Sequence, residues 1–299
     1  MNWKKLLLRQ INSPKLWLLV SGFGFLVPGF GFGQNSEETL ALAQWNFSQK
    51  NFDESIEECE RIVFFEERKN ILAETHFQLA KSFLEKNQYE SAYDNFNKVQ
   101  QFCSTSDSIF MEAEFGKIMS HIARGDAQFA IIPLMDLKSG LLSAYFQKKK
   151  LFYAAVVNYQ VNSWDASERD FIDLLNNDDS LKVSEIFKQV KKIHKKINPK
   201  KAKILSMIMP GAGQLYLGDY KNALNSFLLN GTIVATGVYW AGVYTVVDAY
   251  FFTANWFFRY YKGGYLRAKM TAEEKLFNAD NLYLNQLMGL AEKKLENNR

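Results

Sequence analysis

The chain has 299 residues, of which 47% are hydrophobic and 15% aromatic, and its formal net charge is +4. Residues 36–180 carry 14 Lys and Arg against 24 Asp and Glu, whereas the rest of the chain carries 22 against 8. This length accommodates one soluble domain and a membrane module, and the charge division predicts different surroundings for the two. The acidic central part argues against a nucleic-acid-binding protein.

The first 33 residues have the layout of a secretory signal peptide. A basic leader (Lys4, Lys5, Arg9 and Lys15) precedes an apolar run that begins at Leu16 and ends in small residues near Gly33. We expect cleavage there, which exports the chain from residue 36 onward. The alternative is an uncleaved membrane anchor, which the length of the apolar run favours and its five Gly and one Pro oppose.

Residues 36–180 contain a motif that occurs four times. An aromatic or small residue is followed three positions later by Ser or Ala: Phe52 and Ser55, Tyr89 and Ala92, Ala127 and Ala130, Trp164 and Ser167. Four and seven positions after the small residue come larger apolar residues: Cys59 and Ile62, Phe96 and Val99, Leu134 and Leu137, Phe171 and Leu174. Small or apolar residues occupy a matching upstream position: Ala43, Ala80, Ile118 and Ala155.

This register predicts four pairs of helices. The small residue lets the first helix of a pair approach the second closely, and the larger residues fill the next groove. Turn-forming residues separate the two helices at Lys50-Asn51, Asn87-Gln88, Gly125-Asp126 and Asn162-Ser163. A generic helical bundle is the competing interpretation of the same pattern. For Cys59, which falls at a packed position, we expect a buried free thiol rather than a disulfide with Cys103.

The strings FDESIEECERIV and QLAKSFLEKNQYESAYDNFNKV resemble the tetratricopeptide repeat. The resemblance implies an all-α stack of helical hairpins, a solenoid, whose concave face is lined by the first helix of each pair. Carried over residue by residue, it implies a groove that binds a peptide or a partner helix. The groove positions are Gln44, Phe47, Lys81, Leu84, Met119, Ile122, Val156 and Tyr159. Packing between helices is the alternative role for these residues.

Residues 181–203 form a basic linker with nine Lys and one Glu. Its apolar residues, from Val183 to Ile197, recur at helical spacing, so we expect an amphipathic helix that ends before Pro199. Such a helix lies on an anionic lipid surface, or it caps the last repeat with its apolar stripe.

Residues 204–262 read as a membrane hairpin. The run Ile204–Gly218 contains a Pro-Gly-x-Gly-Gln break, and Ala223–Val247 then continues for 25 residues without a charge, whereas about 20 apolar residues cross a bilayer as a helix. The aromatic segment Ala249–Tyr261 fits the membrane interface. The predicted motif residues are Pro210, Gly211, Gly213, Gln214, Tyr216 and Gly218.

This motif resembles the small two-transmembrane hairpin modules of bacterial membrane proteins, which imply no defined reaction. Together with the leader and the repeats, it is similar to envelope proteins of the Bacteroidetes type. Two topologies stay open: two spans with both ends outside, or one span at Ala223–Val247 with Ile204–Gly218 dipping in and the tail in the cytoplasm. Residues 263–299 are expected to form a charged C-terminal helix.

The sequence offers little for catalysis. Its three His, at positions 76, 121 and 194, lack metal-site spacing, and the Gly-rich stretch lacks the Lys-Ser/Thr end of a phosphate loop. We therefore predict no enzyme, cofactor, metal site or small-molecule substrate. The predicted function is a membrane-tethered scaffold that recruits a protein or peptide partner at the cell envelope. The alternatives are a transport or insertion component whose hairpin is the active part, and a membrane enzyme with an undisclosed site.

Overall fold

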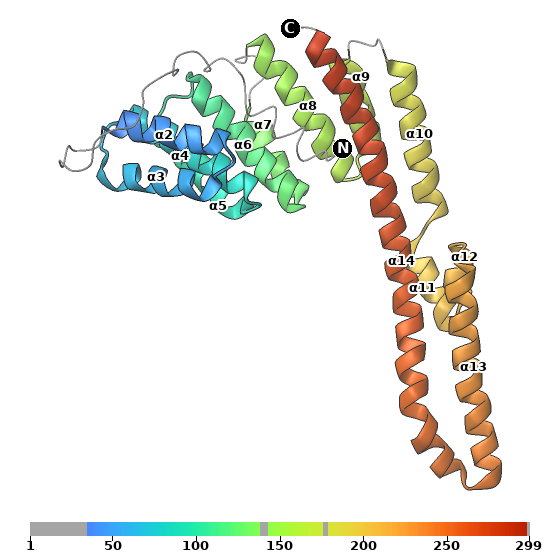
Figure 1. Ribbon diagram of the computed structural model, residues 1–299. Helices are drawn as coiled ribbons and strands as arrows, with labels where there is room; N and C mark the ends of the chain where they lie inside the picture. Colours follow the sequence, from blue (N-terminus) through green and yellow to red (C-terminus); the bar gives the residue numbers. More distant parts are fainter. Residues whose placement is uncertain (1–34, 138–142, 176–178, 298–299) are drawn as a thin grey trace. The chain divides into compact units, whose positions relative to one another are not determined.

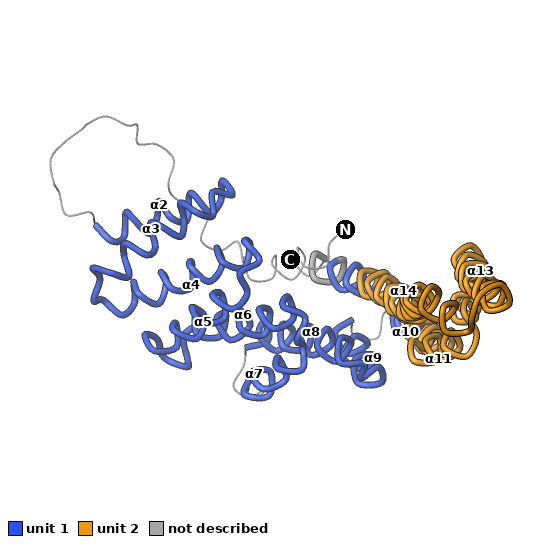
Figure 2. The backbone as a smooth tube through the Cα atoms, turned by 90° about the horizontal axis from the view of Figure 1, so that it is seen from below, with its two compact units in different colours: residues 1–183, 287–299 blue, residues 184–286 orange. Residues whose placement is uncertain are grey.

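The computed structural model describes residues 35–137, 143–175 and 179–297, and every regular element in them is a helix (Figure 1). The predicted leader, residues 1–33, lies outside the described residues. The chain divides into two compact units: residues 1–183 with 287–299, and residues 184–286 (Figure 2). The predicted all-α class is confirmed at this level.

Unit 1 begins with four successive helix pairs. The helices are α2 (Ser36–Ser48) and α3 (Phe52–Phe65), α4 (Lys69–Glu85) and α5 (Tyr89–Val99), α6 (Ser108–Arg124) with the 3-10 helix η2 (Ala127–Ala130) and α7 (Ile131–Asp136), and α8 (Ala144–Gln160) with α9 (Trp164–Leu174). Each helix contacts the next along the chain. The first helices of neighbouring pairs, α2, α4, α6 and α8, also contact one another in turn.

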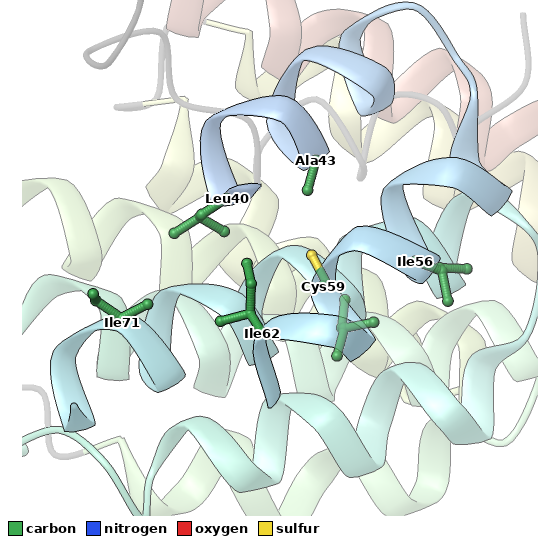
Figure 3. Packing of buried hydrophobic residues seen from close by; sticks show 7 residues of the cluster. Leu40, Ala43, Ile56, Cys59, Ile62 and Ile71 are labelled. Atoms are coloured by element: carbon green, nitrogen blue, oxygen red, sulfur yellow. The ribbon is translucent and has the colours of Figure 1, made fainter. Parts of the chain in front are cut away.

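The predicted register coincides with the interior of unit 1. All four small residues (Ser55, Ala92, Ala130 and Ser167) are completely buried, and so are their upstream partners Ala43, Ala80, Ile118 and Ala155. The larger positions that follow are buried as well. In the first pair, Ala43 faces Cys59. Both belong to an apolar cluster with Leu40, Ile56 and Ile62 of the same pair and Ile71 and Leu79 of α4 (Figure 3).

The turn inside each pair is built the same way. Lys50, Asn87, Gly125 and Asn162 all have left-handed backbone, with φ of 66°, 60°, 93° and 62°. The left-handed residue ends the first helix and redirects the chain, as at many helix C-termini. Hydroxyls at the small positions are hydrogen-bonded. Ser167 Oγ donates to Ala155 O of its own pair at 2.7 Å, and Ser55 Oγ lies 3.1 Å from Ser82 Oγ of the next pair. The third pair departs from the others, because a 3-10 turn and a six-residue helix replace its second helix.

Unit 2 contains most of α10 (Ser180–Lys196), then α11 (Pro199–Ile208), α12 (Ala212–Tyr216), α13 (Tyr220–Val243) and the first part of α14 (Val246–Asn297). Asn198 caps α11 through Lys201 N, and Pro199 fills the first turn, where no backbone N–H is needed. Helix α14 is 52 residues long, so the predicted boundary between residues 262 and 263 falls inside it.

The apolar stripe of α10 is buried: Val183, Phe187 and Val190 are each 0% exposed. Of the two roles considered for the basic linker, this stripe faces protein rather than lipid. The lysines of α10 occupy its other faces. The predicted dipping segment, Ile204–Gly218, comprises the end of α11, a turn and the short α12, and is not one apolar helix.

Candidate functional site

The six predicted motif residues form one junction in unit 2, where α11, α12, α13 and α14 meet. The chain turns at Pro210 and Gly211, and Gly211 has a φ of +93°, which favours glycine. A Cβ on Gly211 would lie 2.4 Å from the carbonyl oxygen of Ala223 in α13. Both the backbone conformation and the space therefore require glycine here.

Gly213 brings α12 against α11. A Cβ on this residue would lie 2.0 Å from Ala202 O and 2.4 Å from Ser206 Oγ, a distance that no packed side chain tolerates. Small residues continue the contact, since Ala202, Ala268 and Ala272 are all fully buried and form a cluster with Leu217. Close approach of small residues is a common way for helices to associate without a large apolar core.

Gln214 ties the turn to α14. Its side chain is 1% exposed; Ser206 Oγ donates to Gln214 Oε1 at 2.8 Å, and Gln214 Nε2 donates to Gly264 O at 2.9 Å. The backbone N–H of Gly213 donates to Ser206 Oγ at 2.9 Å, which completes the chain of hydrogen bonds. Because both ends of the Gln214 amide are engaged, this buried polar group stabilises the junction instead of destabilising it.

Side chains from distant positions satisfy the remaining carbonyl groups of the junction. The Tyr216 hydroxyl donates to Lys196 O, the Tyr261 hydroxyl donates to Met207 O, and Lys275 Nζ donates to Leu217 O at 2.7 Å. Gly218, with a φ of +76°, precedes Asp219, whose carboxylate caps α13 through the N–H of Asn222. The junction is thus a rigid joint whose polar groups bind one another.

Beyond the junction, α13 and α14 run antiparallel. The Cβ position of Gly264 lies 2.9 Å from Ser226 Oγ, and that of Gly237 lies 3.2 Å from Thr253 Oγ1. Nearer the turn between the helices, the Trp240 and Phe252 rings are 4.8 Å apart. In this register, each residue forward on α13 matches one residue back on α14, so Gly231 lies level with Arg259.

The outer surface of this helix pair is apolar and exposed. Helix α13 is long and apolar enough to cross a membrane, and only 6% of its most apolar window is buried. A core helix of a soluble protein would have that window buried. Large exposed side chains cover both helices, among them Phe227, Leu228, Val238, Tyr250, Phe251, Trp256 and Phe258. Exposed apolar area of this extent is typical of a surface that contacts lipid or another protein.

Most of the predicted groove residues lie in the interior of unit 1. Leu84, Met119, Ile122, Val156 and Tyr159 are each no more than 2% exposed. The groove role predicted for these five needs surface that the structure does not give them, and they pack between helices. First-helix residues face the second helix as well as the neighbouring pairs, so helical spacing alone does not say which face stays open.

The other three groove residues keep some exposure, and two of them meet. Lys81 Nζ lies 4.6 Å from the centre of the Phe47 ring and 5.9 Å from that of Phe77, and it donates to Gln78 Oε1 at 3.4 Å. Burial lowers the pKa of Lys81 to about 8. Gln44 lies on α2, one turn before Phe47. These three half-buried residues are the part of the predicted groove that keeps some exposed surface.

Sequence reasoning missed two polar features. The first is a buried cluster between α6 and α8, where Lys149 pairs with Glu112 and lies 5.1 Å from the Phe115 ring. Burial lowers the pKa of Lys149, and the nearby Glu112 carboxylate opposes that shift. The second is the role of Ser206 and Gly264 in the junction. The Gly263-Gly264 pair within a long helix was the available signal for the latter.

Asn225 and Asn230 of α13 differ in their surroundings. Asn225 is exposed, whereas Asn230 is buried and donates to Ser226 O one turn back on its own helix. Within the described part of the chain, no group of three or more His, Cys, Asp or Glu is placed to hold a metal ion. No protein-family model, curated protein or solved structure matches the chain.

Proposed function

We propose that this protein is a membrane-anchored helical-repeat scaffold that recruits a peptide or protein partner at the bacterial cell envelope. The observation that carries the proposal is the exposed apolar surface of α13 and the facing part of α14. Burying such a surface in hydrocarbon removes it from water, at roughly 25 cal/mol per Å². Helix α13, with 24 residues, is about 36 Å long, enough for a bilayer core of about 30 Å.

The recruiting part of the proposal is unit 1, interpreted as four tetratricopeptide-like repeats. Its support is the recurring register: a buried small residue, two buried larger residues and a left-handed turn in every pair. Repeats of this kind present an extended surface and carry no chemistry of their own. A recruiting role without catalysis or a cofactor follows from that interpretation. The accessible contact site is the cluster of Gln44, Phe47 and Lys81.

The location proposed for unit 1 is the outer side of the membrane, after export by the N-terminal leader. Basic residues near the junction favour the cytoplasmic side instead, by the positive-inside tendency. Long translocated domains override that tendency, so in this proposal the N-terminal leader determines the side of the membrane on which unit 1 lies.

One experiment tests both parts, with a photo-crosslinking amino acid placed at Gln44 of the full-length protein. We expect a discrete crosslinked adduct in the membrane pellet that resists alkaline carbonate. Leu228→Asp with Val234→Asp should release the protein from the pellet, because each acidic residue in mid-membrane costs about 3 kcal/mol. The matched control makes the same change at exposed apolar residues of unit 1, Leu42→Asp with Ile132→Asp, and should leave the protein in the pellet.

The adduct tests recruitment separately. Phe47→Ala with Lys81→Ala should abolish it while the protein stays in the pellet. An adduct that survives this change would contradict the proposed contact site, and a protein that carbonate extracts fully would contradict the membrane anchor.

A second function, transport or insertion by the hairpin itself, is favoured by one observation. Asn230 Oδ1 and Ser226 Oγ are buried in unit 2, and within the described residues neither atom has a hydrogen-bond partner. Unpaired polar atoms in a membrane helix are costly and often mark a functional path. If the hairpin performs transport or insertion, substitution of Asn230 should abolish that activity and leave the crosslink at Gln44 unchanged.

A further inference from the structure

One face of α14 carries a line of residues that are polar or basic except for Leu266. Asn255, Arg259, Lys262 and Leu266 recur at alternating spacings of four and three, which places them one above another on the helix, with Lys269 one turn further. The first four are exposed. Within the part of the chain that the structure describes, neither the Arg259 nor the Lys262 side chain has an ion pair or a hydrogen bond to another residue. Both side chains are available to a ligand.

Arg259 lies well inside the apolar part of the hairpin. It is level with Gly231, ten residues beyond Lys221 at the base of α13, or about 15 Å at 1.5 Å per residue. Trp256 and Phe258 flank it with exposed fractions of 54% and 58%. The uncharged stretch of α14, residues 249–258, is about 15 Å long, only half of a bilayer core of about 30 Å. Helix α14 therefore carries the Arg259 cation at a depth where the neighbouring residues of α13 are uncharged.

The base of the hairpin is strongly cationic. Between Pro199 and Met270 the chain has eight basic residues (Lys200, Lys201, Lys203, Lys221, Arg259, Lys262, Arg267 and Lys269) and two acidic ones, Asp219 and Asp248. Asp248 lies near the opposite end of the hairpin, eleven residues before Arg259. A surface with this composition attracts anionic headgroups electrostatically.

We propose that Arg259 and Lys262 bind the phosphate of an anionic phospholipid, drawn below the headgroup plane along α14. The guanidinium donates two parallel hydrogen bonds to phosphate oxygens, and the ammonium one turn away supplies a second positive charge. The neighbouring aromatic and apolar side chains contact the acyl chains of the same lipid. This inference rests on the proposed membrane hairpin and adds the class of lipid that it binds.

A lipid fits this face better than an acidic helix of a partner protein. Lys269, Lys262 and Arg259 lie on one face between the base of the hairpin and the site, interrupted by Leu266, so a headgroup meets successive positive charges on its way from the interface. An acidic partner residue would have to be carried into the membrane in its charged form, at a cost of several kcal/mol.

Trp256 reports on the site, since it is three residues from Arg259, and Trp240 near the turn of the hairpin is the internal comparison. The full-length protein, with Trp3→Phe and Trp17→Phe, is reconstituted into phosphatidylcholine vesicles containing increasing brominated phosphatidylglycerol or brominated phosphatidylcholine. Trp240→Phe leaves Trp256 as the hairpin tryptophan, and Trp256→Phe leaves Trp240. Brominated chains quench tryptophan only on contact.

We expect brominated phosphatidylglycerol to quench Trp256 at a lower mole fraction than brominated phosphatidylcholine, with no such preference at Trp240. Arg259→Gln with Lys262→Gln should raise the half-maximal mole fraction about thirtyfold, or five- to sixfold for each basic side chain. The matched control, Lys69→Gln with Lys98→Gln, makes the same charge change on unit 1 and should have no effect. Circular dichroism checks that each variant is folded.

Equal quenching of Trp256 by both lipids would overturn the lipid site while leaving the membrane hairpin intact. A preference that survives Arg259→Gln with Lys262→Gln would also overturn it, as would a preference that millimolar inorganic phosphate removes and equal ionic strength of chloride does not. Absence of quenching at both tryptophans would contradict the membrane hairpin and the lipid site together.

Discussion

Gly213 is the junction residue least able to accept a side chain. A Cβ on Gly213 would lie 2.0 Å from Ala202 O. That oxygen belongs to the backbone of a helix and cannot rotate aside. Replacement by Ala forces α12 away from α11. That movement also strains the hydrogen bonds that Ser206 and Gln214 make, because Gly213 N belongs to the same network.

Gly213→Ala should therefore lower the free energy of unfolding by about 2–3 kcal/mol, the upper part of the range for overpacked sites. Gly231→Ala is the matched control in the same unit, since nothing lies within 4 Å of its Cβ position and Ala favours a helix by up to about 1 kcal/mol. Thermal unfolding of the reconstituted full-length protein measures both. Equal midpoints for the two variants would mean that the helices separate freely at the junction.

At this scale the sequence predicted which residues form the junction but not what they contact. The Pro-Gly-x-Gly-Gln pattern identified Gly211, Gly213 and Gln214. The partner of the Gln214 amide is Gly264 O, 50 residues away, and no local pattern predicts a partner at that distance. The burial of Cys59, in contrast, was predictable from a local pattern. Its burial follows from the repeat register, and desolvation raises the pKa of its thiol to about 12.

At the scale of elements, the turn inside each helix pair combines one conformation with different residue types. Left-handed backbone costs a residue with a Cβ roughly 1 kcal/mol or more, and costs glycine nothing. Lys50 adopts it with a φ of 66°, whereas Gly125 adopts it with a φ of 93° and has no atom within 4 Å of its Cβ position. Lys50 and Gly125 occupy equivalent turn positions, so glycine can be introduced at one and removed at the other.

Lys50→Gly should stabilise the protein and Gly125→Ala should destabilise it, each by about 1 kcal/mol. Thermal or denaturant unfolding of the full-length protein, followed by far-UV circular dichroism, gives both changes in one series. A shift of the same sign in both variants would contradict the common turn geometry.

The helix pairs illustrate what periodicity predicts. Ser55, Cys59 and Ile62 share one face of α3 and are all buried, because a hydrophobic face recurs with the helical period. Periodicity does not say which face stays open: the resemblance implied that Tyr159 lines a groove, whereas Tyr159 is buried on α8, which α6, α7 and α9 all contact. The shortened second helix of the third pair was not predicted either. Its register is intact, but the six-residue α7 follows a 3-10 turn that the spacing does not reveal.

For the whole molecule, the antiparallel packing of α13 and α14 returns the chain to the end of the hairpin from which it came. The register from Gly237 and Thr253 to Gly264 and Ser226 covers half of α13. This packing favours two passes made by α13 and α14. The two spans expected from the sequence were Ile204–Gly218 and Ala223–Val247, and Ile204–Gly218 is not one helix. Charge counting could not choose between one pass and two, because it does not reveal that α13 and α14 lie side by side.

Single cysteines at Lys98, Lys192 and Lys294 test this topology in intact cells with a membrane-impermeant thiol reagent. Only Cys103→Ser is needed as background, since Cys59 is completely buried and its thiol has a pKa of about 12. All three positions should react before lysis, because the proposed export places unit 1 outside and two passes keep the tail on the same side. Reaction at Lys98→Cys and Lys192→Cys but not at Lys294→Cys would establish a single pass. If the three react only after lysis, the two-pass hairpin stands, unit 1 is cytoplasmic, and its partner belongs inside the cell.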